Sequence, residues 1–333
     1  MIHESVLDCV GGTPVVALGR LFPDAGVEVL AKLEFLNPGG SVKDRAARHI
    51  VRSGLADGTI GPGTHLVEST SGNFGIALAM ACRIHQIPLT VVVDPNITPS
   101  NLTLLRRLGA NVEMVTELDE RGGGYLNQRL RRVQELLATL PDAYWINQYA
   151  NELNLQAHQE TGREILAQVP GPLDLLVAAV STTGTIHGVA GILREAHPAL
   201  RVVAVDAVGS VIFGTASRMR RIPGIGASRV PELLRREEID QVVHVTDEQA
   251  VGGCHALLDQ EGILAGGSSG SVVAALRTLI PSLPVGGRPL RIVTLLPDRG
   301  ERYLDLIYAD PPGPEEDVLD TLTGRPADVR RQR

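Results

Sequence analysis

The sequence predicts an α/β protein of two domains, built from mostly parallel sheets flanked by helices. Its 333 residues are twice or more the roughly 150 that fill one domain. Hydrophobic residues make up 44%, which is enough for a sizeable core. Short β-branched runs alternate with longer amphipathic stretches, and this alternation is typical of parallel strands joined by right-handed helical crossovers.

In the first half of the chain, the expected strands are short runs rich in Val, Ile or Leu, and the expected helices place apolar residues three and four apart. The helix that begins at Pro99 has Thr98 as its candidate N-cap. We expect strands at residues 27–35, 65–68, 89–94 and 111–115, and helices at 44–55, 72–85, 99–108 and 125–140.

The same alternation continues in the second half. We expect helices at residues 152–168, 185–196, 248–260 and 270–280, and strands at 175–179, 202–206 and 292–296. Residues 310–333 combine four prolines with many charges, so we expect a flexible tail. In parallel sheets ligands bind at the loops that follow the carboxyl ends of strands, so chemistry is sought there.

Composition narrows the function classes. The net charge is −7, and no stripe of Lys and Arg offers the positive surface that a nucleic acid requires. The three cysteines are scattered and the nine histidines lack ligand spacing, so neither disulfides nor a metal site is expected. The N-terminus lacks the pattern of a signal peptide, and no apolar run is long enough for a membrane span. We therefore expect a cytoplasmic protein without membrane or nucleic-acid partners.

Three clusters of small residues each precede an expected helix, and the first two also follow an expected strand. Backbone N–H groups at a helix N-terminus bind anions, so the first cluster suits a substrate carboxylate and the second a phosphate. Neither a Walker lysine nor GxGxxG spacing is present, which argues against a nucleotide fingerprint. Taken alone, the first cluster is equally explained as an N-cap turn, and caps of small residues like the third are common. The clusters are 68–73, which comprises Glu68, Ser69, Thr70, Ser71, Gly72 and Asn73; Ser181, Thr182, Thr183, Gly184 and Thr185; and 266–271, which includes Ser268.

Lys43 stands at the expected start of the first helix. An ammonium group is disfavoured at the positive end of a helix, which lowers its pKa or favours its conversion to an imine. The plain alternative is an exposed surface lysine. A phosphate cradle together with an activated lysine suggests pyridoxal phosphate bound as a Schiff base.

Six segments, in the same order along the chain, resemble motifs of the cysteine synthase family, which are pyridoxal-phosphate enzymes of fold type II, the tryptophan synthase β-like fold. The lysine segment, 37–45, looks like the family pattern N-P-x-x-S-x-K-x-R. The first two clusters are similar to the substrate loop T-S-G-N and the phosphate loop G-T-G-G-T. The others are 11–14 (G-x-T-P), 267–270 (G-x-S-S-G) and 297–304 (P-x-x-G-E-R-Y-L).

The resemblance implies a homodimer. It implies a large domain of residues 1–38 and 150–309 and a small mobile domain of residues 39–149. It also implies that Lys43 carries the cofactor and moves the Cα proton, and that Asn73 bonds the cofactor's 3′-oxygen. Ser268 would face the pyridine nitrogen. The phosphate would be held by Ser181, Thr182, Thr183, Gly184 and Thr185, and the substrate carboxylate by Ser69, Thr70, Ser71, Gly72 and Gln148.

The chain departs from plain cysteine synthases by added hydroxyl groups. Ser181 and Thr183 replace two glycines, and Tyr149 stands where Phe is common. Longer stretches at 144–153, 209–214, 223–232 and 296–300 resemble one branch of the family, which implies O-phospho-L-serine and L-glutamate as substrates on a route to 2,3-diaminopropionate for siderophores or antibiotics. The residues that would bind these anions are Arg129, Tyr149, Ser181 and Arg229.

Other readings stay open. A cysteine synthase would join sulfide to O-acetylserine or O-phosphoserine, and a serine or threonine dehydratase is a further member of the class. A non-catalytic protein that kept the fold is opposed by the intact Lys43 and phosphate loop, and a nicotinamide oxidoreductase by the missing GxGxxG. Arg129 has a plainer explanation as part of a solvated helix face with Arg131 and Arg132.

Overall fold

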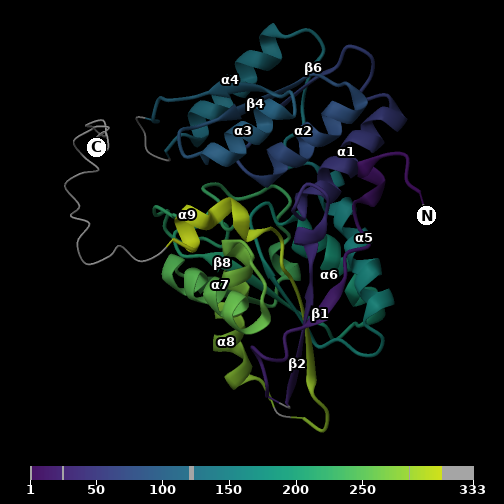
Figure 1. Ribbon diagram of the computed structural model, residues 1–333, viewed down its shortest axis with the longest axis vertical. Helices are drawn as coiled ribbons and strands as arrows, with labels where there is room; N and C mark the ends of the chain where they lie inside the picture. The colour runs from purple at the N-terminus through teal and green to yellow at the C-terminus, as the bar shows by residue number, and fades with distance from the viewer. Residues whose placement is uncertain (1, 25, 120–123, 285, 310–333) are drawn as a thin grey trace, which may run out of the picture.

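The computed structural model describes residues 2–24, 26–119, 124–284 and 286–309. Two sheets organise these residues into two lobes (Figure 1). The large sheet runs in the order β1 (Val15–Ala17), β2 (Val27–Lys32), β10 (Leu290–Leu295), β7 (Leu175–Ala179), β8 (Arg201–Ala207) and β9 (Gln241–Val245). The small sheet runs in the order β5 (Asn111–Met114), β4 (Leu89–Val93), β3 (His65–Ser69) and β6 (Ala143–Trp145).

The strand pairs are parallel except for one, as the alternating sequence predicts. Among the strands of the described residues, only β1 and β2 pair antiparallel, at one edge of the large sheet. The small sheet is parallel throughout. Parallel neighbours need crossover connections, and these bring helices onto the faces of both sheets. The α/β class with parallel-rich sheets is therefore confirmed.

Helices cover both sheets. The small lobe carries α1 (Lys43–Asp57), α2 (Asn73–His85), α3 (Pro99–Arg107) and α4 (Leu126–Thr139). The large lobe carries α5 (Glu152–Gln168), α6 (Gly184–Ala196), α7 (Asp247–Glu261), α8 (Gly267–Leu279) and α9 (Leu304–Ile307). Short 3₁₀ turns are η1 (Val6–Cys9), η2 (Glu34–Leu36), η3 (Arg236–Glu238), η4 (Ile280–Ser282) and η5 (Gly300–Tyr303).

The core of the large lobe has two layers because successive strand residues point to opposite faces. On β7, Val177 packs with residues of α7 and α8 such as Leu257 and Val272. Its neighbour Leu176 packs on the other side with residues of α5 and α6 such as Ile165. The large sheet is thus covered on both faces, and its strand ends are the places open to a ligand.

The predicted helix start at Thr98 is confirmed, since the Thr98 side chain accepts a hydrogen bond from the Asn101 N–H at 3.2 Å. The strand expected at 27–35 ends at Lys32, because Leu33 bonds to the Pro14 carbonyl and the chain then turns into η2. The helix expected at 270–280 begins earlier, at Gly267. Ser268 therefore lies within its first turn rather than before it.

Three strands were not predicted, namely β1, β6 and β9. The first two have three residues each, too few to show a period. The small sheet and α1–α4 all fall within residues 39–149, but the domain boundaries and the mobility of this part stay predictions. The expected tail at 310–333 lies outside the described residues. In the described part of the chain, no helix is long and apolar enough to cross a membrane.

Candidate active site

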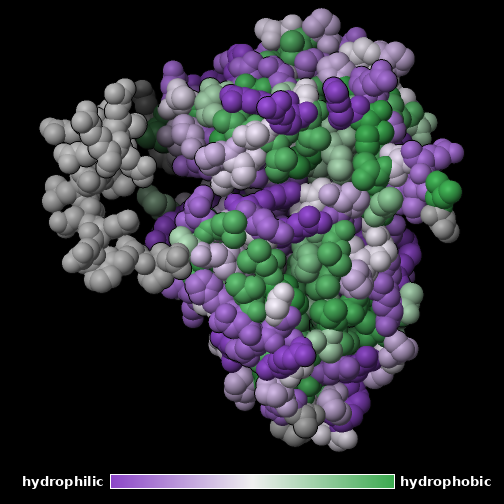
Figure 2. Space-filling view, viewed as in Figure 1, coloured by the Kyte–Doolittle hydropathy of each residue, from purple (hydrophilic) through white to green (hydrophobic). Residues whose placement is uncertain are grey.

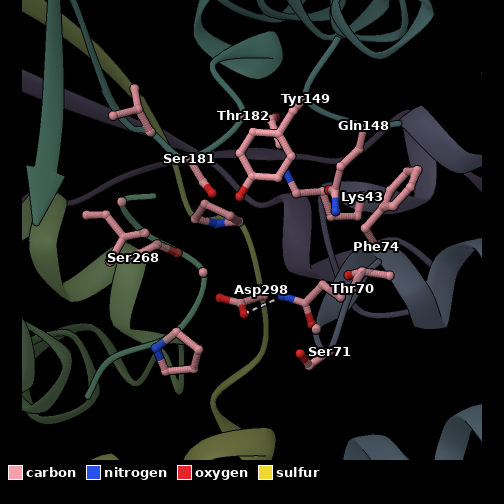
Figure 3. A pocket seen from close by; sticks show the side chains of 18 of the residues that line it. Lys43, Thr70, Ser71, Phe74, Gln148, Tyr149, Ser181, Thr182, Ser268 and Asp298 are labelled. Atoms are coloured by element: carbon pink, nitrogen blue, oxygen red, sulfur yellow. Dashed lines mark hydrogen bonds between the residues drawn. The ribbon is translucent and has the colours of Figure 1, made fainter. Parts of the chain in front are cut away.

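A cavity of about 390 Å³ lies between the lobes, where strand ends of both sheets meet (Figure 3). That volume falls in the usual range for a small-molecule site. Residues from the ends of β3, β6, β7 and β10 contribute to its wall. Of the site residues expected from the sequence, all line this cavity except Gly184. Gly184 packs behind the loop, where an added Cβ would approach Asn154 at 3.0 Å.

Lys43 is the first residue of α1 and its side chain opens into the cavity. Burial lowers the pKa of its amine to about 8, and the negative charge of Asp298 opposes that shift. The direction agrees with the expectation from the sequence, although the cause is burial rather than the helix end. A neutral amine is therefore available near neutral pH, as a nucleophile or base requires.

The whole chain contains two lysines, and the other one is not available for chemistry. Lys32 is fully buried, and its Nζ donates to Glu164 Oε2 at 2.6 Å and to Gln168 Oε1 at 2.8 Å. An aldehyde cofactor needs a primary amine, and among the lysines Lys43 alone offers one to the cavity.

The loop between β7 and α6 is strained at Thr183, whose φ of 64° lies in the left-handed region. Such a conformation is rare for a β-branched residue. The Thr183 hydroxyl is buried and has no hydrogen-bond partner among the described residues. Strain together with an unpartnered buried donor is typical of a ligand site, and here it fits a phosphate at the N-terminus of α6.

The neighbours of this loop are neutral. The Thr182 hydroxyl accepts from Asn154 Nδ2 at 3.1 Å, and the Thr185 hydroxyl lies 3.1 Å from His158 Nε2. Burial lowers the pKa of His158 well below its ordinary value, so the imidazole is neutral. These contacts orient two hydroxyl groups without adding charge to the loop.

The loop between β3 and α2 receives an arginine. Arg129 Nη1 donates to Ser71 Oγ at 3.1 Å, and its Nε lies 3.3 Å from Asp94 Oδ2. The Arg129 side chain is only 16% exposed, so the alternative of a solvated helix face is wrong. The Ser69 hydroxyl of the same loop is buried without a hydrogen-bond partner among the described residues.

A second arginine reaches the wall from the segment between β8 and β9. The Arg229 guanidinium lies 4.5 Å from the centre of the Tyr149 ring, and its Nη2 donates to Asn147 Oδ1 at 3.2 Å. In Figure 3 the Tyr149 and Ser181 hydroxyls point into the same part of the cavity. The four expected anion-binding residues thus line one cavity.

Sequence reasoning assigned no role to five ionisable residues of the cavity wall, namely Glu68, Asp94, Arg220, Asp298 and Tyr303. Glu68 accepts from the backbone N–H groups of Ser69 at 3.0 Å and Gln148 at 3.4 Å, and burial raises its pKa to about 8. The signal that could have found Glu68 and Asp298 is their position in the chain. Glu68 lies near the end of β3 and Asp298 shortly after the end of β10, at the sheet edges where ligands bind.

Comparison with known proteins agrees with this geometry. The family model of pyridoxal-phosphate dependent enzymes matches residues 6–298. A curated relative, N-(2-amino-2-carboxyethyl)-L-glutamate synthase of Cupriavidus metallidurans, is 57% identical over 311 residues, which span 93% of this chain and 91% of the relative.

Solved structures show the same fold. The O-acetylserine dependent cystathionine beta-synthase of Helicobacter pylori is 32% identical with a TM-score of 0.85, over 93% of this chain and all of that one. The O-acetyl serine sulfhydrylase isoform 3 of Entamoeba histolytica is 33% identical with a TM-score of 0.84, over 97% of this chain and 96% of that one.

The amine, the anion cradle and the cavity volume fit pyridoxal phosphate. No cluster of three or more possible metal ligands occurs among the described residues. The chain belongs to the pyridoxal-phosphate dependent enzymes, within the fold type II group of cysteine synthases and cystathionine beta-synthases.

Proposed function

We propose that this enzyme joins O-phospho-L-serine and L-glutamate into N-(2-amino-2-carboxyethyl)-L-glutamate and releases phosphate. The observation that carries the proposal is the 57% identity, over nearly the whole chain, to a synthase of that product. The arginines of the cavity wall support it, because both substrates bring an anionic side group.

Each group of residues has a proposed task. The phosphate of pyridoxal phosphate would be held by Ser181, Thr182, Thr183, Gly184 and Thr185. The carboxylate of phosphoserine would be bound by Ser69, Thr70, Ser71, Gly72 and Gln148. Asn73 and Ser268 would hold the cofactor ring. Unpartnered buried hydroxyls at Thr183 and Ser69 support the first two assignments.

Pyridoxal phosphate, when bound, withdraws electrons from Cα of the amino acid that it holds. Lys43 Nζ would take the Cα proton, and the Cβ–O bond would break with its electron pair leaving on phosphate. The glutamate amine would then form the Cβ–N bond and lose a proton, while Lys43 returns one to Cα. The lowered pKa of Lys43 supports its use as the base.

Arg129, Tyr149, Ser181 and Arg229 are proposed to bind the leaving phosphate and the glutamate carboxylates. Arg129 is already bonded to Ser71 in the loop assigned to phosphoserine. The second candidate is a cysteine synthase that uses sulfide, and the likeness to an O-acetyl serine sulfhydrylase favours it.

The test mixes the purified holoenzyme with phosphoserine and glutamate, and measures phosphate and product mass. We expect phosphate release that depends on glutamate. Release that instead requires sulfide, or turnover of O-acetylserine with sulfide alone, would favour the cysteine synthase. Reduction with borohydride should attach the cofactor's mass to the Lys43 peptide, and Lys43→Ala should lose this adduct and the visible absorption band.

We also propose a cytoplasmic homodimer. Figure 2 shows hydrophobic surface on the large lobe, and the leucines Leu258, Leu304 and Leu306 of α7 and α9 are exposed. Exposed apolar surface of this kind is typical of an interaction face. Sedimentation of the holoenzyme should give twice the mass of one chain, and a monomer would contradict this part of the proposal.

A further inference from the structure

The segment after β10 runs beside the lysine loop, defined here as residues 39–43, and bonds to it repeatedly. The Val42 N–H donates to the Pro297 carbonyl at 2.7 Å, and the Arg299 N–H donates to the Gly40 carbonyl at 3.3 Å. Between these bonds, Ser41 and Asp298 form an antiparallel bridge. Because Lys43 follows Val42 directly, the segment after β10 fixes the position of the Lys43 backbone.

Asp298 is the carboxylate of this segment that lines the cavity, and it is 2% exposed. Its Oδ2 accepts from Asn73 Nδ2 at 2.7 Å, a bond drawn in Figure 3, and from the Tyr303 hydroxyl at 2.5 Å. Its Oδ1 is buried without a hydrogen-bond partner among the described residues. Burial raises the pKa of Asp298, and its hydrogen bonds and the positive charges of Arg302 and Lys43 oppose that shift.

Two cations face Asp298, and one of them has other partners. Lys43 and Arg302 both interact electrostatically with the carboxylate. Arg302 also donates to the Asn73 Oδ1 and to the Gly39 carbonyl. For Lys43, the negative charge of Asp298 opposes the lowering of the amine's pKa by burial.

The other titratable groups beside Asp298 stay protonated. They are Tyr303 on η5, Cys254 on α7 and Tyr308 after α9. Burial raises the pKa of each of them, so none gains a charge near neutral pH. These three groups therefore add no charge beside Asp298 near neutral pH.

Asp298 also determines how the Asn73 amide is turned. Arg302 donates to Asn73 Oδ1 while Asp298 accepts from Nδ2, so the two ends of the amide are distinguished. One N–H of Asn73 is then left for another acceptor. Asn73 is the first residue of α2 and lines the cavity.

We propose that Asp298 is a positioning residue, which fixes the Asn73 amide and supplies the negative charge that faces the Lys43 amine. The inference rests on the proposed function, in which Lys43 takes a proton from Cα and returns it. A facing carboxylate favours the ammonium form. Lys43 can therefore keep the proton after taking it, despite the burial that disfavours its charge.

The first experiment needs no substrate. Lys43 in the full-length chain, freed of cofactor, is acetylated across a range of pH, and mass spectrometry follows the Lys43 peptide. We expect Asp298→Asn to lower the midpoint of Lys43 reactivity by about one pH unit. Glu301→Gln is the matched control, because Glu301 lies in the same segment and is exposed. Lys32 reports folding, since it is fully buried and reacts only in unfolded protein.

The second experiment uses the holoenzyme. Asp298→Asn should shift the visible absorption maximum, lower kcat about tenfold with KM for phosphoserine within threefold, and move the acid limb of the kcat profile to lower pH. Tyr303→Phe also removes one hydrogen bond to Asp298 but keeps the Asp298 charge. It should therefore leave the acid limb of the kcat profile at the wild-type pH.

The outcomes separate the two proposals. The inference is overturned if the pH midpoint of Lys43 acetylation in Asp298→Asn equals that in wild type and in Glu301→Gln, even where Asp298→Asn is less stable. Asp298→Ser gives the same readouts if Lys32 acetylation shows that Asp298→Asn is unfolded. A midpoint that depends on Asp298, in an enzyme that does not couple phosphoserine to glutamate, would support the inference and refute the proposed function.

Discussion

The loop after β3 and the loop after β7 are built alike, but charged side chains bond to the first and neutral side chains to the second. Each consists of small hydroxyl residues between a parallel strand and the N-terminus of a helix, and both open into one cavity. Carboxylates touch the first loop or its neighbours: Glu68 bonds to Ser69, Asp94 pairs with Arg129, and Asp298 bonds to Asn73. The hydrogen bonds of the second loop come from Asn154 and the neutral His158.

This difference matches how long each loop is proposed to hold its anion, the cofactor phosphate at the loop after β7 and the substrate carboxylate at the loop after β3. A cofactor phosphate stays through every turnover, so a loop with helix N–H groups and no neighbouring carboxylate suits it. A substrate carboxylate must leave as product, and Asp94 and Asp298 offset part of the positive charge that Arg129 and Arg302 bring to this loop. Two sites of the same local pattern can therefore hold anions with different strength because of the residues behind them.

The largest predicted effect comes from adding an acid to the second loop. Thr183→Asp should reduce cofactor affinity at least a hundredfold, roughly 3 kcal/mol, because a carboxylate beside the phosphate is repelled at short range. Asp tolerates the left-handed conformation that Thr183 adopts at φ 64°, so the backbone can remain as it is. Equilibrium dialysis with pyridoxal phosphate measures the change.

Thr183→Asn is the matched control for this substitution. Asn has nearly the same shape and also tolerates the left-handed region, but it has no charge. We expect it to keep cofactor affinity within about tenfold of wild type. Equal losses in the two variants would mean that shape, and not charge, distinguishes the loops.

The next effect concerns the acid behind the first loop. Burial raises the pKa of Glu68 from 4.5 to about 8, so between these values the folded protein holds a proton that the unfolded chain has released. Stability from this group is therefore full below about pH 4.5 and is lost as pH rises toward 8. Glu68→Gln lacks this loss. From pH 6 to pH 8, its unfolding free energy should therefore rise by about 2 kcal/mol relative to that of wild type.

Urea unfolding at the two pH values measures this gain. Glu301 is exposed, so the unfolding free energy of Glu301→Gln should differ from that of wild type by the same amount at both pH values. A difference for Glu68→Gln that does not change with pH would show that Glu68 is ionised in the folded protein, and would contradict its raised pKa.

The two loops could be predicted from the sequence because their signal is local. Ser69–Gly72 and Ser181–Thr185 are short runs whose residue types suit an anion site, and Lys43 stands in a recognisable segment. Glu68 and Asp298 could not be assigned in this way. The Glu68 partner Gln148 lies 80 residues away in the chain, and the Asp298 partner Asn73 lies 225 residues away.

The missed parts of the fold have a similar cause. The strand β6 has three residues of intermediate burial. It forms by pairing with β3, in a register that places Tyr144 beside Leu66. No period can appear over so short a run. Pairing between distant segments makes such strands, just as it makes the acid surroundings of the first loop.

A smaller effect tests the strain in the second loop. Thr183→Gly should raise the unfolding free energy of the cofactor-free protein by about 1 kcal/mol, because glycine adopts φ 64° without strain and no buried hydroxyl is left unpartnered. Thr182→Gly is the control, and it should destabilise, since it loses the bond from Asn154 and has no positive φ to relieve. Destabilisation by Thr183→Gly would mean that the strain is absent.

The smallest effect on stability belongs to Gly72, in the first loop. Its φ is −122°, and an added Cβ would meet no atom within 4 Å, so Gly72→Ala should change the unfolding free energy by at most about 0.5 kcal/mol. Its methyl group would enter the cavity beside the carboxylate site, so KM for phosphoserine should rise a few-fold while cofactor affinity stays unchanged. Thr183→Gly should do the reverse, weakening the cofactor more than the substrate. If Gly72→Ala instead weakens the cofactor as much as phosphoserine, the two loops do not divide the anions between them.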